Sequence, residues 1–567
     1  MTKAALLGSL ALLALGAPPL PAAPSAPDRV AAATSGQAPE AGDLVFFPLD
    51  DVSIPWRQNL KVTLERPEKY AGNPVLKAGP VEGPDGYGAL LYGTVIKEGA
   101  KYRMWYLASP RGDPKFARDF AAVQRGSYRP IAYAESADGI HWDRPDLGLV
   151  EFRGNKHNNL VAIEPASAGY ATAYDFVAVL RDPADPDPGR RYKMAYITRD
   201  KPLDRPHDAA STATAVSPDG LRWTLANTAM FTQGNFENTS LTKFDGLYYL
   251  AGQAFALYDG SLADGSSAGR VMKVFFSPDF DHWSSGRALA FARADYRTAR
   301  TSFGQENHMG AGLWNRGNVI LGLYGRWHGD TILTEPVTPS SPLKGLKIDL
   351  GLVVSNDAIH YREPVRNFVM IPRGAPAAWD SEGILQANAF ANTATETYIW
   401  YSHWYTSRPN VIPPLPAALS PVMALKADAI GLARLPRDRF GAFSKLLQVS
   451  QERRPEYNGP LESSCLTRSI RLTVPSRLYV NVDGLKAEDV RIENIQIDTA
   501  LKIDLVDDNE KPLDGYSSTL TENSLKVLVK WPGDKTDLPV QTPFRIKITW
   551  PAEVSGGKVY AIYVEHD

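Results

Sequence analysis

The sequence predicts an all-β protein made of a five-bladed β-propeller followed by a β-sandwich. From about residue 45 to 443, short strand-like segments alternate with Gly, Pro, Asp and Asn, and long amphipathic helices are absent. One turn phrase occurs four times within this region, and one tyrosine-rich strand occurs five times. The 567 residues are also too many for one ordinary hydrophobic core, which favours a repeat architecture.

The turn phrase "AESADGIHW" (134–142) recurs as "AVSPDGLRW" (215–223), "FFSPDFDHW" (275–283) and "VVSNDAIHY" (353–361). Ser and Asp side chains bond to nearby backbone N–H groups in tight turns, and Gly supplies a positive φ. The final Trp or Tyr would then anchor the next strand. We therefore expect a structural hairpin turn that marks the repeat spacing.

A tyrosine-rich apolar strand precedes each copy of the turn. The five examples are "KYRMWYLA" (101–108), "RYKMAYIT" (191–198), "LYYLAGQA" (247–254), "VILGLYGR" (319–326) and "YIWYSHW" (398–404). Strand-rich repeats of roughly 80 residues that cannot bury their own faces are typical of propeller blades packed around an axis.

The chain changes character after "QERRPEYNGP" (451–460), where strands such as "SIRLTVPSRLYVNVDG" alternate apolar and polar residues. The sequence therefore predicts a signal peptide (1–23), a flexible leader (24–43), a five-bladed β-propeller (44–445), a linker (446–460) and a β-sandwich (461–567). For the sandwich, a brace on the propeller is favoured over a carbohydrate-binding module.

The N-terminus "MTKAALLGSLALLALGAPPLPAAPSA" has the layout of a secretory signal, with a lysine, a short apolar run and then small residues. We therefore expect a periplasmic or extracellular protein without membrane insertion. The formal charge of −2 gives no field for nucleic acid. The single cysteine, Cys465, excludes an intrachain disulfide and a thiolate metal cluster, and is expected in the core.

Candidate chemistry lies where the innermost strand of each blade begins, because these strands line the axis of a propeller. Counting back from the tyrosine-rich strands reaches Glu237 in blade 3 and His308 in blade 4. Asp175 opens the inner strand of blade 2, and blade 5 offers Gln386 and Asn388.

This organisation resembles the five-bladed propeller glycoside hydrolases of families 32, 43 and 68 over roughly residues 45–443. The resemblance implies that Glu237 is the catalytic acid, that Asp175 positions substrate or tunes that acid, and that His308 lies near the floor of the site. It allows a structural cation near His308, while no cofactor is expected. An acidic residue at a strand start can instead cap a turn or pair with an arginine, and this alternative stays open.

The first blade departs from the family pattern, because "ALLYGTVIKEG" stands where Asp-Pro is expected. Asp85, shortly upstream, is our candidate for the base, with Glu82 and Glu306 as alternatives. Glycosidic hydrolysis needs two carboxyl groups, one to protonate the leaving oxygen and one to activate water or attack the sugar.

Further substrate contacts are expected from "GRWHGD" and "YSHWY". These candidates are Arg326, Trp327, His328, His403 and Trp404; Glu306, two residues before His308, is a further one, in addition to His308, Gln386 and Asn388. Arg326 would suit an acidic sugar, although an arginine paired within the fold is an equal alternative.

The sequence thus predicts a secreted glycoside hydrolase that cleaves an oligo- or polysaccharide. A non-catalytic carbohydrate-binding propeller is the alternative that the missing acid of blade 1 favours. A sialidase-like enzyme is a third, because the turn resembles the sialidase Asp-box, although five blades are too few for that fold. The sugar, the stereochemical outcome and the oligomeric state do not follow from the sequence.

Overall fold

The computed structural model describes residues 43–110, 129–165, 175–199, 210–227, 236–255, 270–293, 307–329, 346–404, 428–446, 463–485, 500–550 and 556–566. Within these ranges the chain is nearly all β-strand, with one short 3-10 helix, η1 (Pro188–Arg190), and no α-helix. No helix of the described ranges is long and apolar enough to cross a membrane. The prediction of an all-β protein is confirmed at this level.

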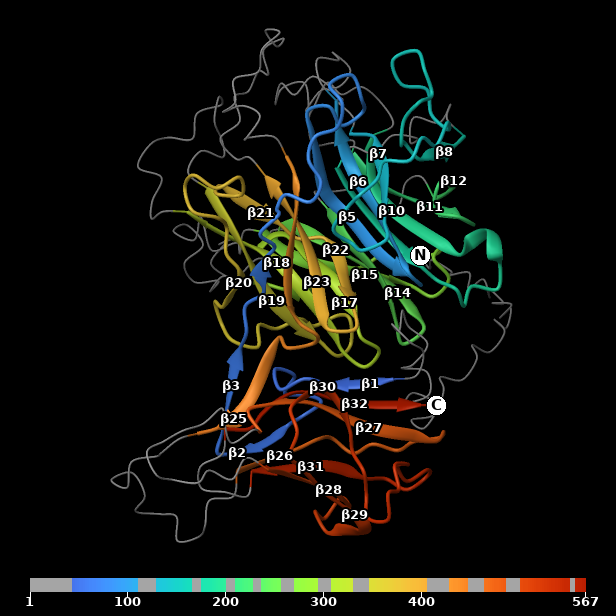
Figure 1. The fold of residues 1–567 in the computed structure, drawn as a ribbon. Helices are drawn as coiled ribbons and strands as arrows, with labels where there is room; N and C mark the ends of the chain where they lie inside the picture. The colour runs from blue at the N-terminus through green and yellow to red at the C-terminus, as the bar shows by residue number, and fades with distance from the viewer. Residues whose placement is uncertain are drawn as a thin grey trace, which may run out of the picture.

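The described strands from residue 88 to 436 divide by their antiparallel pairing into five groups, one for each repeat of the sequence. Parallel strand pairs between repeats 4 and 5 and between repeats 5 and 1 join these three repeats into one sheet. Figure 1 shows these strands above the C-terminal strands. Repeat 1 comprises β5 (Gly88–Glu98), β6 (Lys101–Ser109) and β7 (Ile131–Ser136). Repeat 2 comprises β9 (Asp175–Arg181), β10 (Tyr192–Arg199), β11 (Ala210–Ser217) and β12 (Arg222–Asn227), with β8 (Ala162–Glu164) parallel to β12. Repeat 3 comprises β13 (Glu237–Phe244), β14 (Leu247–Phe255), β15 (Arg270–Ser277) and β16 (Ala288–Phe291).

Repeat 4 comprises β17 (Asn307–Asn315), β18 (Ile320–Gly329), β19 (Leu346–Ser355) and β20 (Val369–Ile371). Repeat 5 comprises β21 (Gly383–Leu385), β22 (Asn388–Asn392), β23 (Glu396–Trp404) and β24 (Ile430–Pro436). Its outer strand is β4 (Glu68–Lys69), from the N-terminal side of the chain, which pairs antiparallel with β24. Each tyrosine-rich segment follows the first strand of its repeat, as β6, β10, β14, β18 and β23. In repeat 5 the first-strand position is shared by β21 and β22, which both pair with β23.

The first strands of the five repeats lie side by side in a closed ring. Strand β5 contacts β9, β9 contacts β13, β13 contacts β17, β17 contacts β22, and β22 pairs in parallel with β5. We call the end at which β9, β13 and β17 begin the upper end of the ring. The lower end, where these strands finish, faces the C-terminal strands (Figure 1).

The repeated turn joins neighbouring repeats. In repeat 1 the carbonyl of Gly139, at φ +77°, accepts hydrogen bonds from Nε1 of its own Trp142 (3.1 Å) and of Trp400 in repeat 5 (2.9 Å). The carbonyl of Gly220 in repeat 2 likewise accepts a bond of 2.7 Å from Trp105 of repeat 1. The expected turn role is confirmed. In these two repeats the turn also accepts a hydrogen bond from a tryptophan of the neighbouring repeat.

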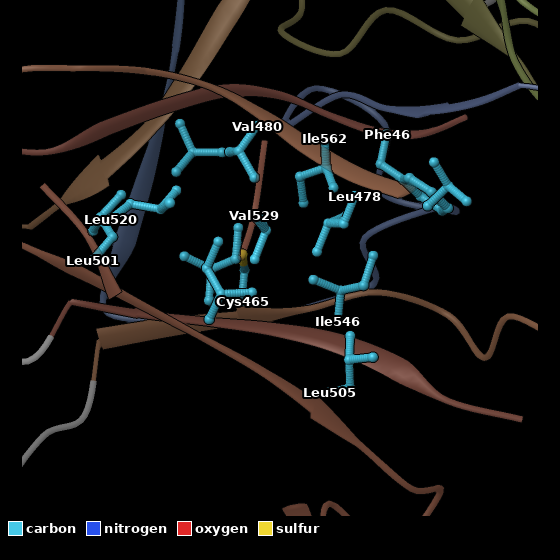
Figure 2. Packing of buried hydrophobic residues seen from close by; sticks show 14 of the residues in the cluster. Phe46, Cys465, Leu478, Val480, Leu501, Leu505, Leu520, Val529, Ile546 and Ile562 are labelled. Atoms are coloured by element: carbon cyan, nitrogen blue, oxygen red, sulfur yellow. The ribbon is translucent and has the colours of Figure 1, made fainter. Parts of the chain in front are cut away.

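A second body lies below the ring and consists of two sheets. One sheet contains β1 (Leu44–Phe46), β3 (Leu60–Leu64), β25 (Gly441–Lys445), β27 (Ser476–Asp483), β30 (Ser524–Leu528) and β32 (Lys558–His566). The other contains β2 (Trp56–Gln58), β26 (Ser463–Leu466), β28 (Leu501–Val506), β29 (Pro512–Leu520) and β31 (Arg545–Trp550). Apolar side chains, including Leu478, Ile546 and the predicted core cysteine Cys465, fill the space between the sheets (Figure 2). Burial raises the pKa of the Cys465 thiol to about 12.

Strands β1, β2, β3 and β25 lie within the residues that we assigned to the propeller, 44–445. However, β1 and β25 pair with β32, β2 pairs with β26, and β3 joins the same sheet by pairing with β25. Local alternation of polar and apolar residues cannot show which distant strand completes a sheet. The predicted boundaries stay a prediction, but residues 44–64 and 441–445 belong to the sheets of the second body.

The second body is firmly packed against repeats 4 and 5. Phe47 and Tyr563 of the second body belong to the same hydrophobic cluster as Leu321 of repeat 4 and Tyr401 of repeat 5. Asp438, which is fully buried, accepts hydrogen bonds from Arg316 of repeat 4, from Asn392 of repeat 5 (3.1 Å) and from the Tyr563 hydroxyl (3.0 Å). This packing favours a bracing role for the second body.

Candidate active site

Asp175, Glu237 and His308 stand at the starts of three consecutive first strands, β9, β13 and β17. Because β13 contacts both β9 and β17, the three positions adjoin one another at the upper end of the ring. The sequence count that selected Glu237 and His308, and the choice of Asp175 as the start of an inner strand, thus point to positions at one end of the ring. The side chain of Asp175 lies outside the described residues, and the catalytic roles stay predictions.

Pairing within the first strands is interrupted at one level near the upper end. The ladder of β5 shifts between Leu90 and Thr94, that of β9 skips Phe176, and that of β13 shifts between Asn238 and Ser240. Strand β17 shifts between His308 and Ala311, and β21 and β22 are separated by Gln386 and Ala387. Phe176 and Met309 adopt positive φ values of 52° and 65° there. Bulges and strained backbone of this kind cluster at functional sites, since they re-aim side chains.

Glu237 is partly buried, and its Oε2 accepts a hydrogen bond from Nε2 of Gln253 on the neighbouring strand β14. Gln253 is only 2% exposed. Its Oε1 accepts a bond of 2.9 Å from the backbone N–H of Met309, which fixes the amide with its nitrogen toward Glu237. Gln253 therefore ties the candidate acid to the bulge of the next first strand.

The residue before Gln253 in this strand is Gly252, which lies opposite the bulge of β13. A Cβ at Gly252 would stand 2.3 Å from the carbonyl oxygen of Glu237, so a side chain would push β13 away. Sequence reasoning missed Gln253, although a polar residue in the apolar strand "LYYLAGQAF" was a usable signal.

His308 is buried between two indole rings, with its ring centroid 4.8 Å from that of Trp327 and 5.1 Å from that of Trp404. Burial, assisted by the nearby Arg270, holds the pKa of His308 well below its usual value. The imidazole is therefore neutral near pH 7. Among the described residues, its Nδ1 has no hydrogen-bond partner.

Gln386 and Asn388, which we expect to contact substrate, connect neighbouring first strands. Gln386 Nε2 donates to the carbonyl oxygens of His308 (2.7 Å) and Gly310 (2.8 Å). Asn388 Nδ2 donates to the carbonyl of Thr239 on β13 (2.9 Å), so its amide reaches past β17. Both amides satisfy backbone groups that the bulges leave unpaired, which favours a structural role over substrate contact.

Asp85, the expected base, is 1% exposed and forms an ion pair of 2.7 Å with Nε of Arg144. It also accepts a hydrogen bond of 2.8 Å from the Tyr106 hydroxyl in the second strand of repeat 1. In repeat 5, Asp380 pairs in the same way with Lys69 (2.6 Å) and with the Tyr401 hydroxyl (3.0 Å).

Both aspartates close a Gly-x5-Asp turn, at Gly79 and Gly374, in which the Gly N–H donates to the Asp carbonyl oxygen. This equivalence gives Asp85 a structural explanation that needs no substrate. Its role as the base stays untested, and its contacts argue against that role. Glu82, the poorer alternative, is exposed and pairs with Arg153.

The remaining expected contacts differ in position. Trp404 is partly buried beside His308, whereas His403 lies on the opposite face of β23, with its ring 5.8 Å from that of Trp379. Arg326 is partly buried on β18. Glu306 and the side chain of His328 lie outside the described residues.

Within the described ranges, no group of three or more His, Cys, Asp or Glu side chains is arranged to hold a metal ion. The cation near His308 stays a prediction.

A cavity of about 820 Å³ lies at the lower end of the ring. It is lined by the finishing residues of the first strands, such as Lys243 and Asn392, and by Tyr563 and Glu565 of the second body. Asn388 lines it from above, so its amide lies between the two ends of the ring. The cavity is separate from the candidate residues at the upper end.

No family model matches the sequence. Two uncharacterized proteins of Mycobacterium tuberculosis, MT1551 of strain CDC 1551 / Oshkosh and Rv1502 of strain ATCC 25618 / H37Rv, are each 24% identical to the chain over 213 residues. The matched part is 37% of this chain and 59% of each relative.

Among solved structures, the chain is similar to a putative glycoside hydrolase from Parabacteroides distasonis (TM-score 0.41, 12% identity, 65% of this chain and 97% of that one). A second is from work on GH130 mannoside phosphorylases and glycoside hydrolases that target β-1,2 mannosidic linkages in Candida mannan (0.41, 12%, 70% and 97%). A third is an N-acetylgalactosamine deacetylase from F. plautii in complex with blood group B trisaccharide (0.41, 13%, 66% and 96%).

Proposed function

We propose that this protein is a glycoside hydrolase whose active site lies at the upper end of a five-bladed β-propeller formed by the ring of repeats. The single observation that carries the proposal is the setting of Glu237. Its carboxyl group accepts a hydrogen bond from the buried Gln253, which also binds the N–H of Met309, the residue after His308. Glu237 opens β13, which contacts both the strand that Asp175 opens and the strand that carries His308.

In the proposed reaction, Glu237 gives a proton to the glycosidic oxygen while a second carboxylate activates water or attacks the anomeric carbon. The bond from that carbon to the leaving oxygen breaks, and water supplies the new oxygen and restores the proton. Since Asp85 is engaged by Arg144, Asp175 becomes our candidate for the second carboxylate. The indole of Trp404 offers an apolar face on which a sugar ring can stack.

The test compares wild type with Glu237→Gln on a panel of plant and algal oligosaccharides, with release of reducing sugar as the readout. We expect the substitution to lower turnover by about 10²–10⁴-fold. Glu396→Gln is the matched control, because Glu396 is also partly buried but lies at the hairpin between β22 and β23, away from the upper end. Equal activity of wild type and Glu237→Gln would remove Glu237 from the role.

A non-catalytic carbohydrate-binding protein is the second candidate. It is favoured by the contacts of Asp85, the candidate base of repeat 1, whose carboxylate is already paired with Arg144 and Tyr106. Binding of an oligosaccharide without turnover, unchanged in Glu237→Gln, would support this alternative.

We also propose that the protein is exported and processed after its N-terminal apolar segment. The support is the layout of residues 1–23. Cell fractionation followed by N-terminal sequencing of the mature chain tests this, and an unprocessed cytoplasmic chain would overturn it.

A further inference from the structure

Three arginines lie near Trp327 on β18: one covers its ring, one binds its carbonyl oxygen, and one precedes it in the sequence. The guanidinium carbon of Arg270 lies 4.3 Å from the centre of the indole ring. Arg293 Nη1 donates a bond of 2.8 Å to the Trp327 carbonyl oxygen, and Arg326 is the preceding residue. Since Trp327 packs on His308, Arg270 borders the candidate active site. Arg326 points to the other face of β18, where it lies close to Arg293.

Arg326 and Arg293 are poorly compensated by negative charge. Among the described residues Arg326 forms no ion pair, and its Nε is buried without a hydrogen-bond partner. Glu363 is the nearby carboxylate, but it accepts its hydrogen bond of 2.5 Å from the Tyr324 hydroxyl. Burial, together with the charge of Arg326, lowers the pKa of Arg293. Arg293 and Arg326 thus carry two positive charges beside the single negative charge of Glu363, so a further anion would balance the charge.

The position of Arg326 suits a group attached to a bound sugar. Arg326 pairs with Asn307, the residue before His308, so its backbone stands beside the start of β17. Neighbouring strands are about 4.8 Å apart, and an arginine side chain spans more than that distance. Side chains alternate along β18, so Arg326 lies on the face opposite Trp327. An anion bound by Arg326 would therefore lie on the face of β18 opposite Trp327, and it would leave the Trp404 ring available for a sugar to stack on.

We propose that Arg326, with Arg293, forms a subsite for the anionic group of a saccharide, so that the substrate is a uronic acid-containing or sulfated oligosaccharide. This rests on the proposed function and names its substrate class. A guanidinium presents a planar pair of donors that matches a carboxylate or a sulfate with two parallel hydrogen bonds. An anion in this subsite would also remove the repulsion between the two arginines.

The experiment measures binding by thermal shift, which needs no turnover. Wild type, Arg326→Gln, Arg326→Lys and the control Arg222→Gln are titrated with inorganic sulfate, glucuronate and glucose at low ionic strength. Arg222 is an exposed strand residue of repeat 2, remote from the cluster. We expect sulfate or glucuronate to raise the Tm of wild type and of Arg222→Gln. Glucose should have a much smaller effect. The shift should disappear in Arg326→Gln and persist in part in Arg326→Lys.

The two anions distinguish the sources, because a preference for glucuronate indicates a uronic acid and a preference for sulfate indicates a sulfated sugar. Equal anion shifts in wild type and Arg326→Gln would overturn the subsite. Without ligand, Arg326→Gln should be at least as stable as wild type, because one of two repelling charges is removed. A lower Tm without ligand would instead show that Arg326 supports the fold.

Hydrolysis assays separate failure of the subsite from failure of the enzyme. Anion binding that depends on Arg326, without turnover of any saccharide, would keep the subsite and reject the hydrolase. Turnover of neutral oligosaccharides that depends on Glu237 but is unchanged in Arg326→Gln would keep the hydrolase and reject the subsite.

Discussion

Gln253 donates a hydrogen bond to the carboxylate of Glu237 across the first two strands of repeat 3. The direction of this bond is fixed, because the other end of the amide accepts from the Met309 N–H, which can only donate. Arg270 Nη1 also donates to that end, at 3.4 Å. A buried amide thus connects the candidate acid, the bulge of β17 and the arginine cluster around Trp327.

Replacing Gln253 by Leu should reduce activity through the position of Glu237. The substitution removes the donor to Glu237 and leaves the Met309 N–H buried without a partner, which costs about 1–3 kcal/mol of stability. We expect kcat to fall by roughly tenfold or more, because the Glu237 carboxyl group is no longer held in place. The pH profile of kcat should also shift, because that carboxyl group loses its hydrogen-bond donor. Gln58→Leu, on an exposed strand of the second body, is the control. A stable Gln253→Leu variant with an unchanged pH profile would contradict a positioning role.

His308 should make the free energy of unfolding depend on pH in acid. Its folded-state pKa is lowered, so between that value and the ordinary pKa of about 6.5 the unfolded chain binds the additional proton. Stability is therefore unaffected above pH 6.5 and falls as the pH drops below it, by up to about 1.4 kcal/mol per pH unit. When the free energy of unfolding is measured with urea between pH 7 and 5, it should fall less steeply with pH for His308→Gln than for wild type. The exposed-residue control His157→Gln should keep the wild-type slope.

Asp438 should be a principal stabilising residue between the ring and the second body. Burial would raise the pKa of Asp438, but the charge and hydrogen bond of Arg316, together with the Asn392 amide and the charge of Arg437, outweigh burial and lower it. Asp438→Asn leaves the charge of Arg316, which is 5% exposed, without its partner, at a cost of roughly 3–5 kcal/mol. Because the folded pKa is depressed, the stabilisation is present above pH 4 and is lost as the pH falls through the folded value. An Asp438→Asn variant with wild-type Tm would contradict this.

The parts of the fold that the sequence predicted are those set by local chemistry. Period-two alternation and Ser-x-Asp-Gly turns act within a few residues, so the five tyrosine-rich strands and the turns after β7, β11, β15 and β19 could be located. The pairing of β1, β2 and β3 with C-terminal strands joins residues hundreds of positions apart, which no local pattern encodes.

The candidate site was predictable only in part for the same reason. Glu237 and His308 interrupt apolar strands at equivalent positions, and that interruption is visible in the sequence. The partners Gln253 and Arg270 are determined by strand register and packing. The ion pair of Asp85 with Arg144, 59 residues further along the chain, could not be predicted from the sequence, although the Gly-x5-Asp spacing that recurs at Asp380 was a usable signal of a structural role.

Asp85 offers the sharpest test between a structural and a catalytic carboxylate. Asp85→Asn keeps the shape of the side chain but leaves Arg144 without its ion pair. Arg144 is 23% exposed, so we expect a loss of roughly 2–3 kcal/mol, below the range for fully buried pairs. Asp380→Asn should be destabilised to a similar extent, because Asp380 holds the equivalent place beside Tyr401. Assayed well below their Tm, both variants should keep activity within about threefold of wild type. A folded Asp85→Asn variant that is inactive, beside an active Asp380→Asn, would restore Asp85 as the base.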